Sequence, residues 1–158
     1  SLLIDTSVLI KWFHSGGESE LEEARALRSA HVTGGVDTHV LDLAFYEMGN
    51  VLTRALRWTA ADVVDQLDDL NTVVGPALAM SPAWLRRAST LAHTHALSFY
   101  DASWAATAVE LDIPLVSADR RLLAAGLAES PTEIATRSLY DHHGGLWRHG
   151  WMYEGSPA

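Results

Sequence analysis

The sequence predicts an α/β fold in which helices flank a central, mostly parallel sheet. The apolar runs at residues 2–4 and 113–116 have the length of buried strands, and the segments between them have helical periodicity. Strands that alternate with helices favour a parallel sheet. Both apolar runs are followed by an acid, Asp5 and Asp119. These two carboxylates should therefore lie at the carboxyl edge of the sheet, where open α/β sheets bind ligands.

Caps, breakers and periodicity give the remaining elements. Helices are predicted over residues 8–13, 19–30, 41–57, 59–71, 82–95, 102–111 and 120–125. Further short strands are predicted at residues 36–40, 73–74 and 133–137. Ser19 begins a capping-box pattern with Glu22, Thr59 is a predicted N-cap, and Ser81 precedes a proline at the first helical position.

The composition fits one domain of ordinary size. The chain has 158 residues, 48% of them hydrophobic, which suffices for a core. The absence of cysteine excludes disulfides, a thiolate metal site and a cysteine nucleophile, and it permits a reducing compartment. No apolar run reaches the roughly 18 residues that a membrane span needs, and the N-terminal segment lacks the basic region of a signal peptide. We expect a cytoplasmic protein without membrane association.

The net charge of −9 argues against a protein that coats nucleic acid by charge alone. Such binding depends on Lys and Arg side chains that neutralise phosphates. It does not exclude nuclease chemistry, because carboxylates that hold divalent cations create a locally positive field.

Four acids form the candidate site: Asp5, Glu47, Asp101 and Asp119. Mg²⁺ and Mn²⁺ prefer oxygen ligands, and cleavage of a phosphodiester needs a metal to activate water and neutralise developing charge. Taken singly, each acid has a structural alternative, since it could cap a helix, pair with a nearby arginine or lie in a loop. The prediction of a metal site therefore depends on the four acids together.

Four segments together resemble a PIN domain, and within that family the VapC-type ribonuclease toxins of toxin–antitoxin pairs. They cover residues 2–10, 46–54, 100–106 and 114–122. Their order and spacing match over about residues 2–139. The resemblance implies a PIN-like nuclease domain at residues 1–139. It leaves residues 140–158 as a His- and Trp-rich C-terminal tail to which we assign no structure.

The resemblance also implies an activity, a Mg²⁺- or Mn²⁺-dependent endoribonuclease that is the toxin of a VapBC-type system and cleaves RNA by metal-activated water. It gives metal-binding and catalytic roles to Asp5, Glu47, Asp101 and Asp119, and supporting roles to Thr6, Ser7 and Ser117. A VapB-type antitoxin and a homodimer follow only from the resemblance. Arg120, beside Asp119, is a candidate phosphate contact.

Other acidic α/β classes lack a necessary group. A phospho-receiver domain needs a lysine after a late strand, but Lys11 is the only lysine. A haloacid-type phosphatase needs a second Asp two residues after the first, where Ser7 stands. A catalytically silent PIN-like protein that acts as a regulatory or RNA-binding partner stays an alternative, which a metal-dependent cleavage assay would separate from the enzyme.

The histidines and tryptophans lack a recognised ligand spacing. Candidate zinc ligands are His93, His95, His142, His143 and His149. Without cysteine or a pattern such as H-E-x-x-H, surface or partly buried histidines are the favoured interpretation. The tryptophans are interpreted mainly as core or interface anchors.

Overall fold

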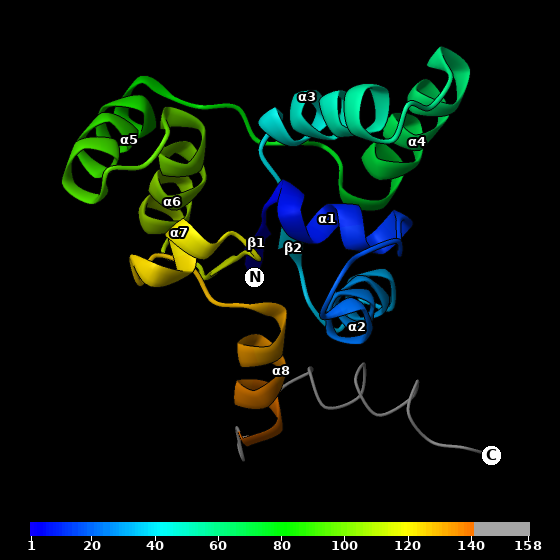
Figure 1. Cartoon of the computed structure of the whole chain (residues 1–158). Coiled ribbons are helices and arrows are strands. Elements are labelled where there is room, and N and C mark those ends of the chain that lie inside the picture. Colours follow the sequence, from blue (N-terminus) through cyan, green and yellow to red (C-terminus); the bar gives the residue numbers. More distant parts are fainter. Residues whose placement is uncertain (141–158) are drawn as a thin grey trace.

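A computed structural model of the chain describes residues 1–140, which form the predicted α/β architecture (Figure 1). The parallel sheet has the strand order β2-β1-β3 and consists of β1 (Leu2–Ile4), β2 (Thr38–His39) and β3 (Leu115–Val116). Leu3 pairs with His39 on one side and Leu115 on the other. The central strand β1 is buried along its whole length, which explains its continuous apolar sequence.

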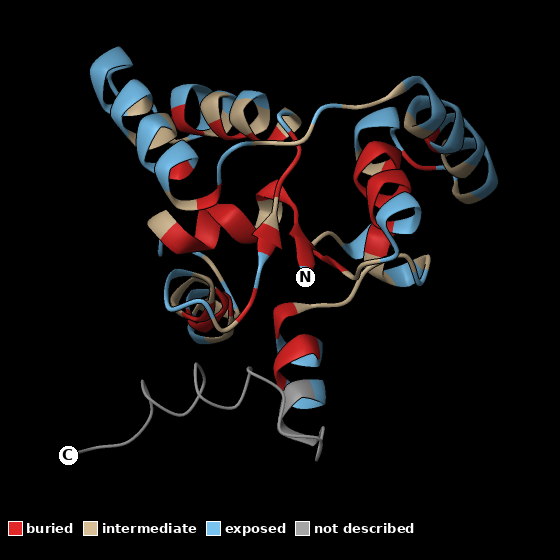
Figure 2. Ribbon diagram, turned by 180° about the vertical axis from the view of Figure 1, so that it is seen from behind, coloured by how far each residue is buried: buried red, intermediate tan, exposed pale blue. Residues whose placement is uncertain are grey.

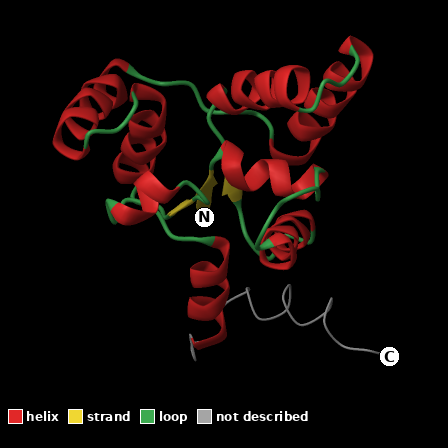
Figure 3. Cartoon of the chain, viewed as in Figure 1, coloured by secondary structure: helices red, strands yellow, loops and turns green. Residues whose placement is uncertain are grey.

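Helices pack around this sheet (Figure 3). They are α1 (Thr6–Phe13), α2 (Leu21–Val32), α3 (Leu43–Asn50), α4 (Ala60–Val74), α5 (Pro82–His95), α6 (Phe99–Leu111), α7 (Arg120–Ala124) and α8 (Pro131–Tyr140). A π-helical turn, η1 (Val51–Ala55), directly continues α3. No helix within residues 1–140 is both long and apolar enough to cross a bilayer.

The core gathers buried residues of the sheet and of several helices, among them α1, α2, α3 and α6 (Figure 2). Seven successive residues of α6, from Ala102 to Ala108, are buried, and five of them are alanine or serine. Such small side chains let the helix backbone approach the sheet closely. Trp104, 1% exposed, is the large residue among them, and it reaches the candidate site described below.

Two predicted strands are wrong, because both segments are helical. Residues 73–74 are the last turn of α4. Residues 133–137 lie inside α8, which begins with a capping box. The Ser130 Oγ accepts a hydrogen bond from the Glu133 N–H at 3.1 Å, and the Glu133 carboxylate accepts one from the Ser130 N–H at 2.7 Å. Pro131 follows at the first helical position.

Two predicted helix starts also need correction. The capping box expected at Ser19 does not form, because Glu20 is the N-cap residue of α2, with a left-handed φ of 53°. The Glu20 carboxylate instead accepts hydrogen bonds from the N–H and hydroxyl of Thr132, which connects α2 to α8. The helix predicted from residue 102 starts earlier, at Phe99, because Ser98 caps it. The other predicted caps are confirmed, at Thr59 and Ser81.

The only lysine, Lys11, is buried and paired. It is 3% exposed, and its Nζ donates hydrogen bonds to the Glu18 carboxylate at 2.7 Å and to the Ser19 carbonyl at 2.8 Å. A buried ammonium without a counter-charge is costly. The ion pair therefore fixes the connection between α1 and α2.

Replacing the partner of this lysine is expected to destabilise the protein. Glu18→Gln keeps an acceptor but removes the negative charge that compensates Lys11, so the free energy of unfolding should fall by about 1–3 kcal/mol. The loss stays below that of a fully buried pair because the Glu18 side chain is 26% exposed. Urea unfolding at neutral pH measures it. Glu22→Gln, the same change at an exposed position of α2, is the control and should shift the midpoint little. Equal midpoints for both variants would contradict this expectation.

Candidate active site

Asp5 and Asp119 lie at the carboxyl ends of the neighbouring parallel strands β1 and β3. Each also caps the helix that follows its strand. The Asp5 carboxylate accepts a hydrogen bond from the Ser7 N–H at 3.0 Å, and the Asp119 carboxylate accepts from the N–H groups of Arg121 and Leu122 at 2.9 and 3.1 Å. Helix capping and a place at the sheet edge are therefore compatible at both positions.

Two serine hydroxyls hold Asp5 in place. Ser7 Oγ donates to Asp5 Oδ1 and Ser117 Oγ donates to Asp5 Oδ2, each at 2.5 Å. The same hydroxyls accept hydrogen bonds from the backbone of the loop after β3, where Ser7 binds the Ala118 N–H at 2.8 Å and Ser117 binds the Asp119 N–H at 2.9 Å. The two serines thus join the strand ends and orient a carboxylate that is only 4% exposed.

Glu47 reaches the same region from α3. Its Oε1 accepts hydrogen bonds from Thr6 Oγ1 at 3.0 Å and from the Trp104 indole N–H at 2.9 Å. Within residues 1–140 Glu47 forms no ion pair with Arg54 or Arg57, the alternative that the sequence allowed. Sequence reasoning missed the role of Trp104, although it lies three residues after Asp101 on one helix and so shares a face with it.

Asp101 lies in the first turn of α6 but is not its cap. The N-cap is Ser98, whose Oγ accepts a hydrogen bond from the Asp101 N–H at 3.1 Å. The Asp101 carboxylate is thus not needed to cap the N-terminus of the helix, so the alternative that Asp101 is an N-cap is excluded. Arg120 is the first residue of α7 and is exposed, beside Asp119.

Each of the four acids lies within electrostatic reach of the next, so we call them the acidic line: Asp5, Glu47, Asp101 and Asp119. The pKa of Asp5 is raised to about 7: burial raises it most, the charge of Glu47 also raises it, and the hydrogen bonds from Ser117 and Ser7 lower it.

The next two carboxyls follow the same pattern. Burial raises the pKa of Glu47, and the charge of Asp101 adds to the rise. The hydrogen bonds from Trp104 and Thr6 lower it in part. Burial, and then the charge of Asp119, raise the pKa of Asp101, while Ser98 and Arg121 lower it. When these carboxyl groups are ionised, their negative charges repel one another.

The acidic line suits a hard divalent cation by its chemistry. All its donors are oxygens, which Mg²⁺ and Mn²⁺ prefer. No Lys or Arg side chain within residues 1–140 forms an ion pair with these acids. As arranged, however, no three His, Asp or Glu side chains of the described part lie close enough together to hold one ion. The carboxylates would have to close around a cation that binds there.

The raised pKa of Asp5 predicts a pH dependence of the metal-free protein. A carboxyl whose pKa is higher in the folded than in the unfolded state stabilises the fold below the unfolded pKa of about 4, and this contribution is lost as the pH rises through the folded pKa of about 7. The free energy of unfolding in chelator should therefore fall between pH 5 and pH 8 by up to about 3 kcal/mol. Asp5→Asn should flatten the profile, and an equal slope in both proteins would rule Asp5 out as its source.

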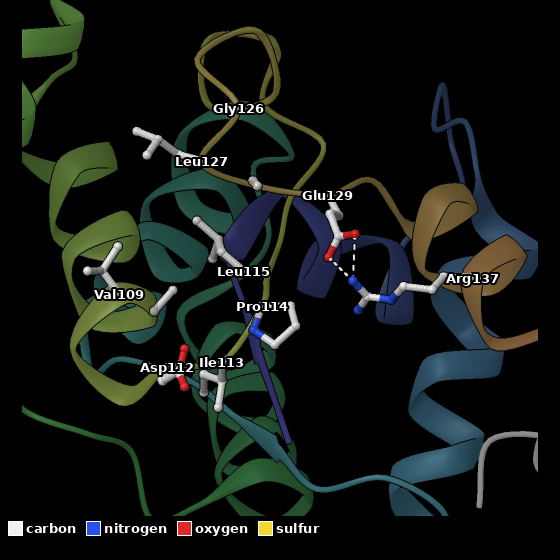
Figure 4. A pocket seen from close by; sticks show the side chains of 11 residues that line it. Val109, Asp112, Ile113, Pro114, Leu115, Gly126, Leu127, Glu129 and Arg137 are labelled. Carbon is white, nitrogen blue, oxygen red and sulfur yellow. Dashed lines mark hydrogen bonds and ion pairs between the residues drawn. The ribbon is translucent and has the colours of Figure 1, made fainter. Parts of the chain in front are cut away.

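A cavity of about 710 Å³ lies at the other end of the sheet, where β3 begins (Figure 4). Its lining is mainly apolar and includes Val109, Ile113, Leu115 and Leu127. The guanidinium of Arg137 binds the Glu129 carboxylate at 2.8 Å on one side of it. None of the acidic line borders this cavity, so it has no part in the candidate site.

The histidine-based zinc site has no support in residues 1–140, where no three His, Asp or Glu side chains lie close enough together to bind a metal ion. The His93 ring Nδ1 lies 2.9 Å from the Ser89 carbonyl on its own helix. His95 is the last residue of α5. The remaining candidates, at residues 142, 143 and 149, lie outside the described residues, as does the tail predicted from residue 140, apart from Tyr140, which ends α8.

The PIN domain family matches residues 2–127, so the chain belongs to this family. The predicted PIN fold is thereby confirmed. One similar solved structure, PAE2754 from Pyrobaculum aerophilum, is 25% identical, with a TM-score of 0.62, and the match covers 87% of this chain and 95% of that one. Another, a toxin–antitoxin complex from Klebsiella pneumoniae, is 17% identical, with a TM-score of 0.61 and coverage of 83% and 98%. No curated protein matches the chain significantly.

Proposed function

We propose that this protein is a Mg²⁺- or Mn²⁺-dependent endoribonuclease and the toxin of a VapBC-type toxin–antitoxin pair. PIN domains are commonly nucleases. The observation that supports the proposal most is the acidic line, in which a buried, doubly hydrogen-bonded Asp5 lies within electrostatic reach of further carboxylates. The similar fold of a toxin–antitoxin complex supports a VapB-type antitoxin as partner. We also propose a homodimer, on family resemblance alone.

In this proposal Asp5, Asp101 and Asp119 hold the cation, and Glu47 completes its shell or orients water. When bound, the metal would supply charge neutralisation at the phosphate and an activated water. Ser7 and Ser117 keep Asp5 in one orientation, and Trp104 and Thr6 do the same for Glu47. The chain has no cysteine, and a direct attack by water needs no covalent intermediate.

Arg120 is proposed to contact a phosphate of the substrate. It is exposed, and no ion pair of the described residues involves it. A guanidinium next to the acids would bind an RNA phosphate by charge-assisted hydrogen bonds.

The test is an assay of purified protein on structured and single-stranded RNAs with Mg²⁺, Mn²⁺ or chelator. We expect internal cleavage with either metal and none in chelator. Binding of RNA without cleavage under every metal condition would favour the catalytically silent alternative. Cleavage that persists in chelator would contradict the metal mechanism.

A further inference from the structure

We propose that the acidic line receives single-stranded RNA whose bases stack on two exposed tyrosines, Tyr46 and Tyr100, and that this stacking outweighs phosphate attraction in binding. This inference rests on the proposed function and deepens it, since it names the form of RNA and the side chains that hold it. The two tyrosines are positioning residues in this scheme, because they touch bases and not the reacting phosphate.

Large exposed aromatic side chains gather at the candidate site. Within residues 1–140 the large hydrophobic residues that are exposed include three aromatic ones: Tyr46 at 73%, Tyr100 at 63% and Phe99 at 47%. Tyr46 directly precedes Glu47, and Phe99 and Tyr100 directly precede Asp101. Among residues 1–137, for which the exposure of side chains is described, the other exposed large hydrophobic residues are valines and leucines. Every exposed aromatic ring of this set thus adjoins an acid of the line.

The helices place these rings beside the carboxylates and not over them. Successive residues of a helix point about 100° apart. Glu47 points inward, to Thr6 and Trp104, so Tyr46 points away from these contacts, in agreement with its exposure. The Trp104 indole N–H of α6 donates a hydrogen bond to the Glu47 carboxylate of α3 at 2.9 Å, so α3 and α6 meet at this site. The two tyrosines therefore belong to the rim of one site, contributed by two helices.

Electrostatic attraction alone gives the chain little affinity for RNA. Its net charge is −9. Several arginines are already engaged: Arg87 pairs with Glu110 and Arg137 with Glu129, while Arg25 and Arg28 donate to backbone carbonyls. Among the described residues, Arg54, Arg57, Arg86, Arg120 and Arg121 are exposed arginines without an ion-pair partner, and of these Arg120 and Arg121 directly follow an acid of the line, Asp119. Two phosphate contacts are few compared with those of proteins that bind nucleic acid electrostatically.

Base stacking supplies affinity without positive charge. Every base has a π-face, and substitution of a stacking aromatic by alanine typically weakens binding by about 5- to 100-fold. Bases in a duplex are already stacked on one another, whereas those of a single strand or loop are free to stack on protein side chains. Exposed tyrosines beside an acidic site therefore suit unpaired RNA.

The experiment measures binding by fluorescence anisotropy, with Mg²⁺ and with Asp5→Asn protein so that the RNA stays intact. One probe is a labelled single-stranded RNA, and the second is the same length of abasic strand, which has the same phosphates but no bases. We expect Tyr46→Ala and Tyr100→Ala each to weaken binding of the RNA by about 5- to 100-fold. The phenylalanine variants should bind like the parent, because the ring is retained.

Further readings separate stacking from charge. The abasic strand should bind weakly to every variant. For the single-stranded RNA, a plot of the logarithm of affinity against the logarithm of salt concentration should have a slope of only about −1 to −2, as expected for two phosphate contacts on a single strand. Val64→Ala, an exposed residue on α4 at 56%, is the matched control and should leave binding unchanged. In wild-type protein the tyrosine variants should raise KM and leave kcat nearly unchanged.

Equal binding of the abasic strand, or a steep salt slope, would overturn the stacking proposal. So would tyrosine variants that change the oligomeric mass in sedimentation but not the RNA affinity, since the rings would then belong to a protein interface. If wild-type protein cleaves RNA and the tyrosine variants bind and cleave normally, stacking is wrong and the nuclease assignment stands. If nothing is cleaved with any metal but binding depends on the tyrosines, stacking stands and the nuclease assignment fails.

Discussion

Asp5→Asn is expected to lower the rate of RNA cleavage by about three orders of magnitude or more, as removal of a group central to catalysis does. The substitution keeps the shape of a side chain that is 4% exposed and held by Ser7 and Ser117. It removes the negative charge with which Asp5 would hold a cation. Because burial raises the pKa of Asp5, the neutral amide should not unfold the metal-free protein, so the loss belongs to the chemistry and not to the fold.

The matched control is Asp112→Asn, which makes the same change in charge at the other end of α6. Asp112 is exposed and has a left-handed φ of 53°, a conformation that asparagine accepts. This variant should cleave RNA at the wild-type rate. Single-turnover cleavage with saturating Mg²⁺ measures the chemical step. In cells, expression of wild-type protein should arrest growth and Asp5→Asn should relieve the arrest; a toxic Asp5→Asn protein would contradict the assignment.

The parts of the fold that the sequence predicts correctly have strong local signals. Strand β1 is a continuous apolar run because it lies between two other strands and is buried on both faces. Thr59 and Ser81 form the expected capping hydrogen bonds. Residues 133–137 were misassigned because their composition resembles a short strand. The capping signal that identifies the helix pairs Glu133 with Ser130, which precedes residues 133–137 in the sequence.

The candidate site divides in the same way. The positions of Asp5 and Asp119 follow from the sequence, since Asp5 comes directly after the first apolar run and Asp119 three residues after the last residue of the second. The partners of Glu47 do not, because its hydrogen bond to Trp104 joins residues 57 positions apart and exists only through the packing of α3 near α6. Which acids interact electrostatically likewise depends on tertiary structure. Residue types indicated the chemistry, whereas the supporting contacts needed the fold.

The acidic line also has a thermodynamic consequence. Burial and like charge raise the pKa values of Asp5, Glu47 and Asp101, so ionising these groups together costs stability in the metal-free protein. A divalent cation would remove that repulsion in the folded state only. Proteins that bind a ligand only when folded gain stability by mass action.

Saturating Mg²⁺ or Mn²⁺ is therefore expected to raise the thermal midpoint. At a concentration about 100-fold above Kd the gain is about 2.7 kcal/mol, or roughly 5–10 °C for a chain of this size. Asp101→Asn should lose most of this gain and melt in chelator at or above the wild-type midpoint, because it removes a charge from the line. Asp112→Asn should keep the full gain, which excludes a general effect of divalent ions on an acidic protein. The acids of the line are not gathered around one point without metal, so the gain also measures whether they close on a cation. An unchanged wild-type midpoint would mean that these four carboxylates are not a metal site.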